Sequence, residues 1–152
     1  MSKESEAKSA NIEESLVHAV QKQDITTATA LLAQGASPNA PVKTDDGYCR
    51  TTTTALFAAC ESKNVALVKL LLDRGADPNI EYRMRSINEF EYSCCLIAAS
   101  PSFEISRLLL GAGANPNGTI TYGESDRFVR TALKVAEGNP ELTKLLKEFG
   151  AK

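Results

Sequence analysis

The chain has 152 residues, with 17 basic and 19 acidic side chains and a formal net charge of -2. This near balance gives no electrostatic footprint for nucleic acid or an anionic membrane, and no apolar run approaches the ~18 residues of a membrane span. The length predicts one globular domain.

The N-terminal segment, residues 1–10, is polar and lacks the apolar stretch of a secretory signal. We expect it to be a tail that precedes a single domain at residues 11–152. Without an export signal we place the chain in the cytoplasm and expect its thiols to be reduced. The four cysteines are Cys49, Cys60, Cys94 and Cys95.

Four segments of the chain have similar sequences. Each ends an apolar helical stretch with leucine and then a Gly-Ala pair, at residues 31–39, 71–79, 109–117 and 145–152. A glycine just past a helix favours the left-handed conformation that closes the last turn. In the first three segments a proline follows within three residues, and it cannot continue a helix. The pattern predicts helices that end at these glycines.

Each of these helices also has a predicted start. The residues at the expected N-caps accept hydrogen bonds from the first helical turn. They are Asp24, Asn64, Ser102 and Asn139, the last followed by Pro140 at the first helical position. A shorter helical stretch lies upstream of each cap, so every unit is expected to be a helix pair.

The Leu-Leu-x-x-Gly-Ala-x-x-Asn endings and the Thr-x-Leu-x-x-Ala openings resemble ankyrin repeats over about residues 11–152. The resemblance implies an all-α solenoid of four helix-turn-helix units with long β-hairpin loops. The repeats are expected at approximately 11–40, 50–80, 90–118 and 127–152. None of the openings, at 14–17, 54–57, 94–97 and 131–134, keeps the family's Thr-Pro-Leu-His intact, so we expect modest stability.

The loops between repeats are unusually long. The repeat glycines are 40, 38 and 37 residues apart, whereas the ankyrin unit has ~33 residues. Insertions in repeat proteins map to one face, which is often the binding face. We therefore expect three parallel hairpin fingers, at residues 40–53, 80–93 and 118–130.

The fingers are rich in residues that dominate protein interfaces. They contain all four tyrosines and five of the seven arginines, and both residue types are enriched in binding hot spots. The alternative is that the aromatics only stabilise the hairpins by cross-strand contacts. The predicted partner-binding residues are Tyr48, Arg50, Tyr82, Met84, Phe90, Tyr92, Tyr122, Arg127 and Phe128.

A register can be predicted for the middle finger. A three-residue turn at 86–88 would place opposite charges on one face and an aromatic strip on the other. The predicted pairs are Arg85 with Glu89 and Arg83 with Glu91 on the charged face, and Met84 with Phe90 and Tyr82 with Tyr92 on the aromatic face. In the first finger, Asp46-Gly47 predicts the turn. In the third, a turn at 123–126 would bring Ile120 near Val129.

No catalytic or metal-binding set emerges from the sequence. His18 is the only histidine and lies in a predicted helix, and it cannot complete a usual zinc set. Cys94 and Cys95 replace the Thr-Pro of the opening motif and are expected to be semi-buried core thiols. We therefore expect no metal and no cofactor.

The shared asparagines Asn39, Asn79 and Asn117 each follow a leucine by eight residues. This arrangement is similar to ankyrin sites that asparagine hydroxylases modify. The interpretation we prefer is that the amides make turn hydrogen bonds.

The sequence thus predicts a non-enzymatic protein-protein interaction module, either an adaptor or a stoichiometric inhibitor. It would act as a monomer and bind another protein or peptide through its hairpin loops and concave face, with no nucleic acid or membrane partner. The alternative is a small enzyme that uses arginines and loop carboxylates such as Asp45, Asp46 and Glu124.

Overall fold

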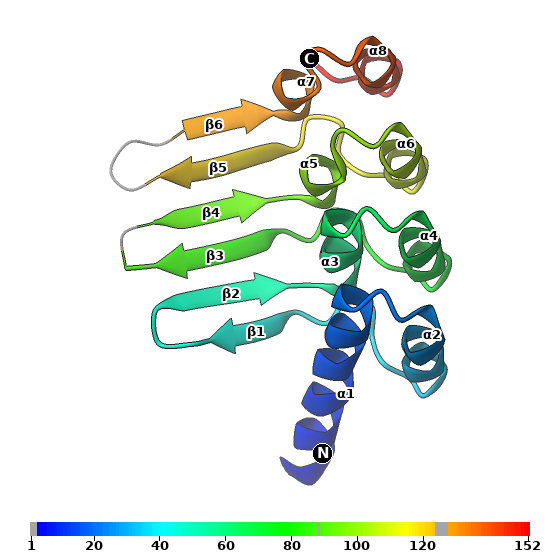
Figure 1. Ribbon diagram of the computed structural model, residues 1–152, viewed down its shortest axis with the longest axis vertical. Coiled ribbons are helices and arrows are strands. Elements are labelled where there is room, and N and C mark those ends of the chain that lie inside the picture. Colours follow the sequence, from blue (N-terminus) through cyan, green and yellow to red (C-terminus); the bar gives the residue numbers. More distant parts are fainter. Residues whose placement is uncertain (1–2, 88, 124–127) are drawn as a thin grey trace.

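The computed structural model describes residues 3–87, 89–123 and 128–152, with residues 3–11 described by their backbone alone. The described helices form four pairs (Figure 1). The pairs are α1 (Lys3–Gln21) with α2 (Ile25–Ala33), α3 (Ala55–Glu61) with α4 (Val65–Asp73), α5 (Cys95–Ala99) with α6 (Phe103–Gly111), and α7 (Ala132–Val135) with α8 (Pro140–Glu148). Helix α1 includes most of the segment that we expected to be a tail.

The helices stack in two rows. The first helices of the pairs (α1, α3, α5 and α7) form an inner row, and the second helices form an outer row (Figure 1). Each helix packs against its own partner and against the next helix of its row. This stacking of repeats is the arrangement of a solenoid.

The predicted N-caps are confirmed for all four outer helices. The side chains of Asp24, Asn64, Ser102 and Asn139 each accept a hydrogen bond from the backbone N–H three residues further on. Helix α4, for example, begins where Asn64 Oδ1 accepts from the N–H of Leu67 at 3.1 Å. These bonds satisfy amide groups that a helix start leaves without intrahelical partners.

The helix ends follow the glycine pattern. After α4, Gly75 has a φ of +81°, the left-handed conformation that glycine adopts without a Cβ penalty. The N–H of Gly75 donates to the carbonyl of Leu72, and the N–H of Ala76 donates to that of Leu71, both at 3.0 Å. This pair of bonds is a Schellman motif, which turns the chain away from the helix axis toward the hairpin.

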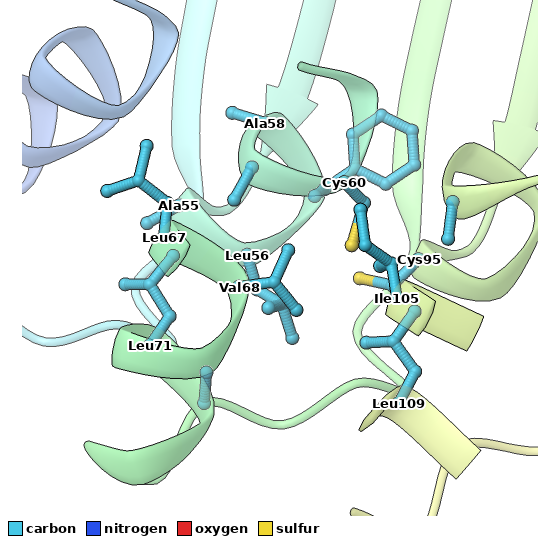
Figure 2. Packing of buried hydrophobic residues seen from close by; sticks show 14 of the residues in the cluster. Ala55, Leu56, Ala58, Cys60, Leu67, Val68, Leu71, Cys95, Ile105 and Leu109 are labelled. Carbon is cyan, nitrogen blue, oxygen red and sulfur yellow. The ribbon is translucent and has the colours of Figure 1, made fainter. Parts of the chain in front are cut away.

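The apolar core lies between the two rows of helices. In Figure 2, Leu56 and Val68 of the second pair lie near Ile105 and Leu109 of the third pair. All four side chains are fully buried. Packing between successive pairs therefore forms one continuous core.

The three hairpins join in a single six-stranded antiparallel sheet (Figure 1). Its strands are β1 (Val42–Asp45), β2 (Cys49–Thr53), β3 (Tyr82–Ser86), β4 (Phe90–Ser93), β5 (Thr119–Gly123) and β6 (Phe128–Thr131). Pairing between β2 and β3 and between β4 and β5 connects neighbouring hairpins. The expected all-α class is therefore corrected to mixed helices and antiparallel strands.

The predicted register of the middle hairpin is wrong by one residue. The N–H of Ser86 donates to the carbonyl of Glu89 at 2.8 Å, so two residues form the loop instead of three. Two-residue loops match the twist of the flanking strands, which explains the difference. The observed pairs are Tyr82 with Ser93, Arg83 with Tyr92, Met84 with Glu91, and Arg85 with Phe90.

This shift separates the charges of the hairpin. Arg83 and Arg85 point to one face of the sheet, and Glu91 points to the other, because side chains alternate along a strand. The predicted ion pairs of Arg83 with Glu91 and Arg85 with Glu89 do not form. Arg83 pairs with Glu81 instead, at 3.2 Å.

The first hairpin turns where the sequence predicts. Gly47 has a φ of +87°, and the N–H of Asp46 donates to the carbonyl of Cys49 at 3.3 Å. In the third hairpin the predicted turn falls largely outside the described residues. We expected Ile120 to lie near Val129. The cross-strand partner of Val129 is instead the next residue, Thr121.

Candidate protein-binding surfaces

The sheet has two different faces. One, which we call the groove face, is turned toward the inner helices: the rings of Tyr82 on β3 and Phe57 on α3 stack at 4.4 Å with an interplanar angle of 3°. The opposite side is called the outer face. From the register, the groove face carries Val42, Thr44, Thr51, Thr53, Tyr82, Met84, Glu91, Ile120, Tyr122, Phe128 and Arg130.

A groove runs between the groove face and the inner helices. At its N-terminal end, Val17 and His18 of α1 and Val42 and Thr51 of the first hairpin line a pocket of about 420 Å³. At this end of the molecule the first hairpin and α1 therefore leave a concave surface between them. A peptide or a loop of another protein can enter such a surface.

Apolar side chains line the groove face of the second and third hairpins. The rings of Tyr122 and Phe128 stack at 5.7 Å. Met84 and Tyr122 lie on either side of Glu91 in the sheet and line a smaller pocket of about 200 Å³. These residues come from three strands, so the sheet register determines their arrangement.

Two carboxyl groups face this part of the groove. Partial desolvation raises the pKa of Glu61, at the end of α3, and the nearby charge of Glu91 raises it further. Desolvation also raises the pKa of Glu91. The pKa of Tyr82 is raised by burial first and by these two carboxylates second. The groove is therefore both apolar and locally acidic.

The outer face carries the other predicted aromatics. The rings of Phe90 and Tyr92 lie 5.7 Å apart and are tilted by 48°. Because of the one-residue shift, they share a face with Arg83 and Arg85 instead of with Tyr82. The predicted single aromatic strip is wrong: its four members are divided between the two faces of the sheet.

Two predicted binding residues lie at or near the tip of the first hairpin. Tyr48 is 78% exposed in the first turn. Arg50 is on the outer face and pairs with Asp45 at 2.7 Å. Arg127 lies outside the described residues.

The shared asparagines connect successive repeats. Asn79 donates from Nδ2 to the carbonyl of Gly113 at 3.1 Å and accepts from the N–H of Asn115 at 2.8 Å. Asn39 makes the equivalent pair of bonds to the next repeat, and Asn117 accepts from the N–H of Lys152. These bonds support the interpretation that the amides have a structural role.

The thiols of the second and third repeats belong to the core. Cys60 and Cys95 are fully buried on adjacent inner helices, and they lie next to each other in Figure 2. A hydrogen bond with Cys95, together with burial, raises the pKa of Cys60 well above its usual value. Cys94 is half-buried and packs closely against Gly118. A Cβ atom added at position 118 would lie 2.6 Å from the Sγ of Cys94.

His18, the histidine considered as a metal ligand, is exposed on α1.

Two residues of α3 that act on the groove face were missed from the sequence. Phe57 fixes the position of Tyr82, and Glu61 contributes charge. They are four residues apart in α3, which places them on one side of the helix. That spacing, in an otherwise small and apolar helix, is the signal that identifies them.

Comparison with known families gives one match. The family model described as "Ankyrin repeats (3 copies)" matches residues 3–82, which is more than half of the chain. No curated protein matches the sequence. Among the described residues, no helix has the length and apolar character needed to span a bilayer.

Proposed function

The chain belongs to the ankyrin-repeat family, and from this membership we propose that it is a non-enzymatic adaptor or stoichiometric inhibitor that binds a partner protein in its groove. Ankyrin repeats are generally protein-protein interaction modules. The proposed binding surface consists of the inner helices and the groove face of the sheet. We propose that the chain acts as a monomer in the cytoplasm.

The observation that carries this proposal is the apolar lining of the groove. Met84, Tyr122 and Phe128 converge on the groove face from three strands. Phe128 is 58% exposed although it lies in an ordered strand. Met84 and Tyr122 are half-buried. Accessible aromatic and methionine side chains gathered on one face are typical of binding sites.

Charge in the groove suggests what the partner presents. Neither Glu61 nor Glu91 has an ion pair among the described residues, although surrounding protein partly desolvates both carboxylates. A cation from the partner would offset this desolvation cost. The groove therefore suits a segment that combines apolar side chains with a lysine or arginine.

The proposal can be tested by calorimetry with a partner captured by the 152-residue chain. We expect a saturable one-to-one complex without chemical turnover of either component. Replacing Tyr122 or Met84 by alanine should weaken binding by roughly 1–4 kcal/mol, as expected for hot-spot residues.

Phe103→Ala is the matched control, because Phe103 is 39% exposed on α6, away from the sheet. It should leave affinity unchanged. If the groove variants bind as tightly as the unmodified chain, the groove is not the binding site. Turnover of the partner would instead support the enzyme alternative.

A further inference from the structure

The outer face of the sheet concentrates positive charge. It carries Lys43, Arg50, Arg83 and Arg85, and each of these side chains is exposed. Among the described residues, two acidic side chains pair with them, Asp45 with Arg50 and Glu81 with Arg83. This excess of positive charge is found on a chain whose formal net charge is -2. The patch is therefore a local feature and does not follow from the overall composition.

Two of these arginines lie directly opposite each other. Arg50 on β2 pairs in register with Arg85 on β3, and like charges at directly opposed positions destabilise a sheet. Asp45 pairs with Arg50, but no carboxylate of the described residues pairs with Arg85. Pairing of the two hairpins thus places Arg85, which has no ion pair among the described residues, directly beside Arg50.

Aromatic rings adjoin this basic patch. Phe90 is the cross-strand neighbour of Arg85, and Tyr92 is the neighbour of Arg83. Tyr92 is 38% exposed, and the rings of Phe90 and Tyr92 contact each other at 5.7 Å. Arginine and tyrosine are both enriched in protein–protein interfaces and in their binding hot spots.

We propose that the outer face is a second docking surface, which binds an acidic segment of a partner protein that also carries an aromatic or aliphatic residue. Carboxylates of the segment would pair with Arg83 and Arg85, since guanidinium binds carboxylate in a bidentate geometry. The apolar residue of the segment would pack on Phe90 and Tyr92. An acidic protein segment fits better than nucleic acid, because the negative net charge of the chain opposes a polyanion that extends beyond the patch.

This surface is independent of the groove. Side chains of the outer face and the groove face point away from each other across one sheet, and no residue belongs to both. A partner in the groove leaves the outer face uncovered. The protein would then connect two binding partners, as an adaptor does.

The test uses the full chain and a short fluorescein-labelled peptide in which glutamates flank a phenylalanine. Binding is followed by fluorescence anisotropy at low and high salt. We expect saturable binding that weakens with salt, because exposed charges are screened. Arg83→Glu and Arg85→Glu should each weaken binding by about tenfold or more, and the milder Arg85→Gln should weaken it by less.

Matched variants decide whether the effect belongs to this surface. Arg107→Glu makes the same charge change on α6, where Arg107 is exposed, and should alter affinity by less than about twofold. Tyr122→Ala, on the groove face, should leave peptide binding unchanged. Circular dichroism of each variant checks that the fold is retained.

Any of four results would overturn the proposal. The first three are that the peptide does not bind the unmodified chain, that Arg107→Glu weakens binding as much as Arg85→Glu, and that a single-stranded oligothymidylate binds more tightly than the acidic peptide. If Tyr122→Ala abolished peptide binding, the segment would occupy the groove, which also contradicts a second surface. Because partner binding in the groove is measured separately, failure of one proposal does not imply failure of the other.

Discussion

Ser102 and Ser106 lie one turn apart at the start of α6, and their hydroxyl groups differ in hydrogen bonding. Ser102 Oγ accepts a hydrogen bond from the N–H of Ile105 at 3.4 Å and caps the helix. Ser106 is fully buried, and its Oγ has no hydrogen-bond partner in the described part of the chain. The same substitution at the two positions therefore separates capping from desolvation.

We expect Ser102→Ala to lower the free energy of unfolding by about 1 kcal/mol, because an N-cap is lost. Ser106→Ala should leave it unchanged or raise it by up to about 1 kcal/mol, because a buried polar atom without a partner is removed. Urea denaturation of both variants measures the difference. A large loss of stability in Ser106→Ala would mean that its hydroxyl has a partner, such as a buried water.

The thiols give a second test at the residue scale. Cys49 is on β2, part-exposed, whereas Cys60 and Cys95 are fully buried. Burial also raises the pKa of Cys94, so less of this thiol is ionised at a given pH. We expect a thiol reagent to modify Cys49 rapidly in the native protein, Cys94 slowly, and the buried pair only on unfolding. Loss of the fast phase in Cys49→Ser is the control, and equal rates at all four sites would contradict these burial assignments.

At the scale of single elements, local signals in the sequence predict the helices well. Caps such as Asn64 and helix-ending glycines such as Gly75 act within a few residues of themselves. Their hydrogen bonds therefore do not depend on the rest of the fold. For the same reason the positions of the four outer helices followed from sequence alone.

The sheet could not be predicted in the same way. The register of the middle hairpin depends on whether its loop has two or three residues. In the structure Ser86 bonds to Glu89 through both its backbone N–H and its hydroxyl group, which accompanies the shorter loop. Pairing between hairpins depends further on the spacing of the repeats, which no residue of a single hairpin encodes. The candidate binding residues were thus placed in the correct loops, but their division between two faces was not foreseen.

The middle hairpin is anchored to the helices through Tyr82. Its ring stacks on Phe57, and the side chain packs against the buried core. Tyr82→Ala should therefore lower the free energy of unfolding by about 1–3 kcal/mol. Tyr92→Ala, on the outer face of the same hairpin, should cost less than about 0.5 kcal/mol. If urea denaturation finds equal costs for the two tyrosines, Tyr82 does not anchor the hairpin to α3.

At the scale of the whole molecule, the sheet adds a second connection between repeats. In a solenoid each repeat contacts its neighbours, and stability is close to a sum of repeat and interface contributions. Here the β2–β3 and β4–β5 pairings join the same neighbours that the helices join. The asparagine bridges, such as that from Asn79 to Gly113, connect the bases of the loops as well. These parallel connections should make unfolding more cooperative than helix stacking alone would.

This cooperativity can be measured because the chain has no tryptophan and all four tyrosines lie in the hairpins. Tyrosine fluorescence therefore reports the sheet, and far-ultraviolet circular dichroism reports mainly the helices. We expect the two signals to change together in a single urea transition, since coincident transitions indicate two-state unfolding. Shortening the middle loop would remove both inter-hairpin pairings and should separate the two transitions or lower their common midpoint. If tyrosine fluorescence in the unmodified chain changes at a lower urea concentration than the helical signal, the sheet melts independently and does not couple the repeats.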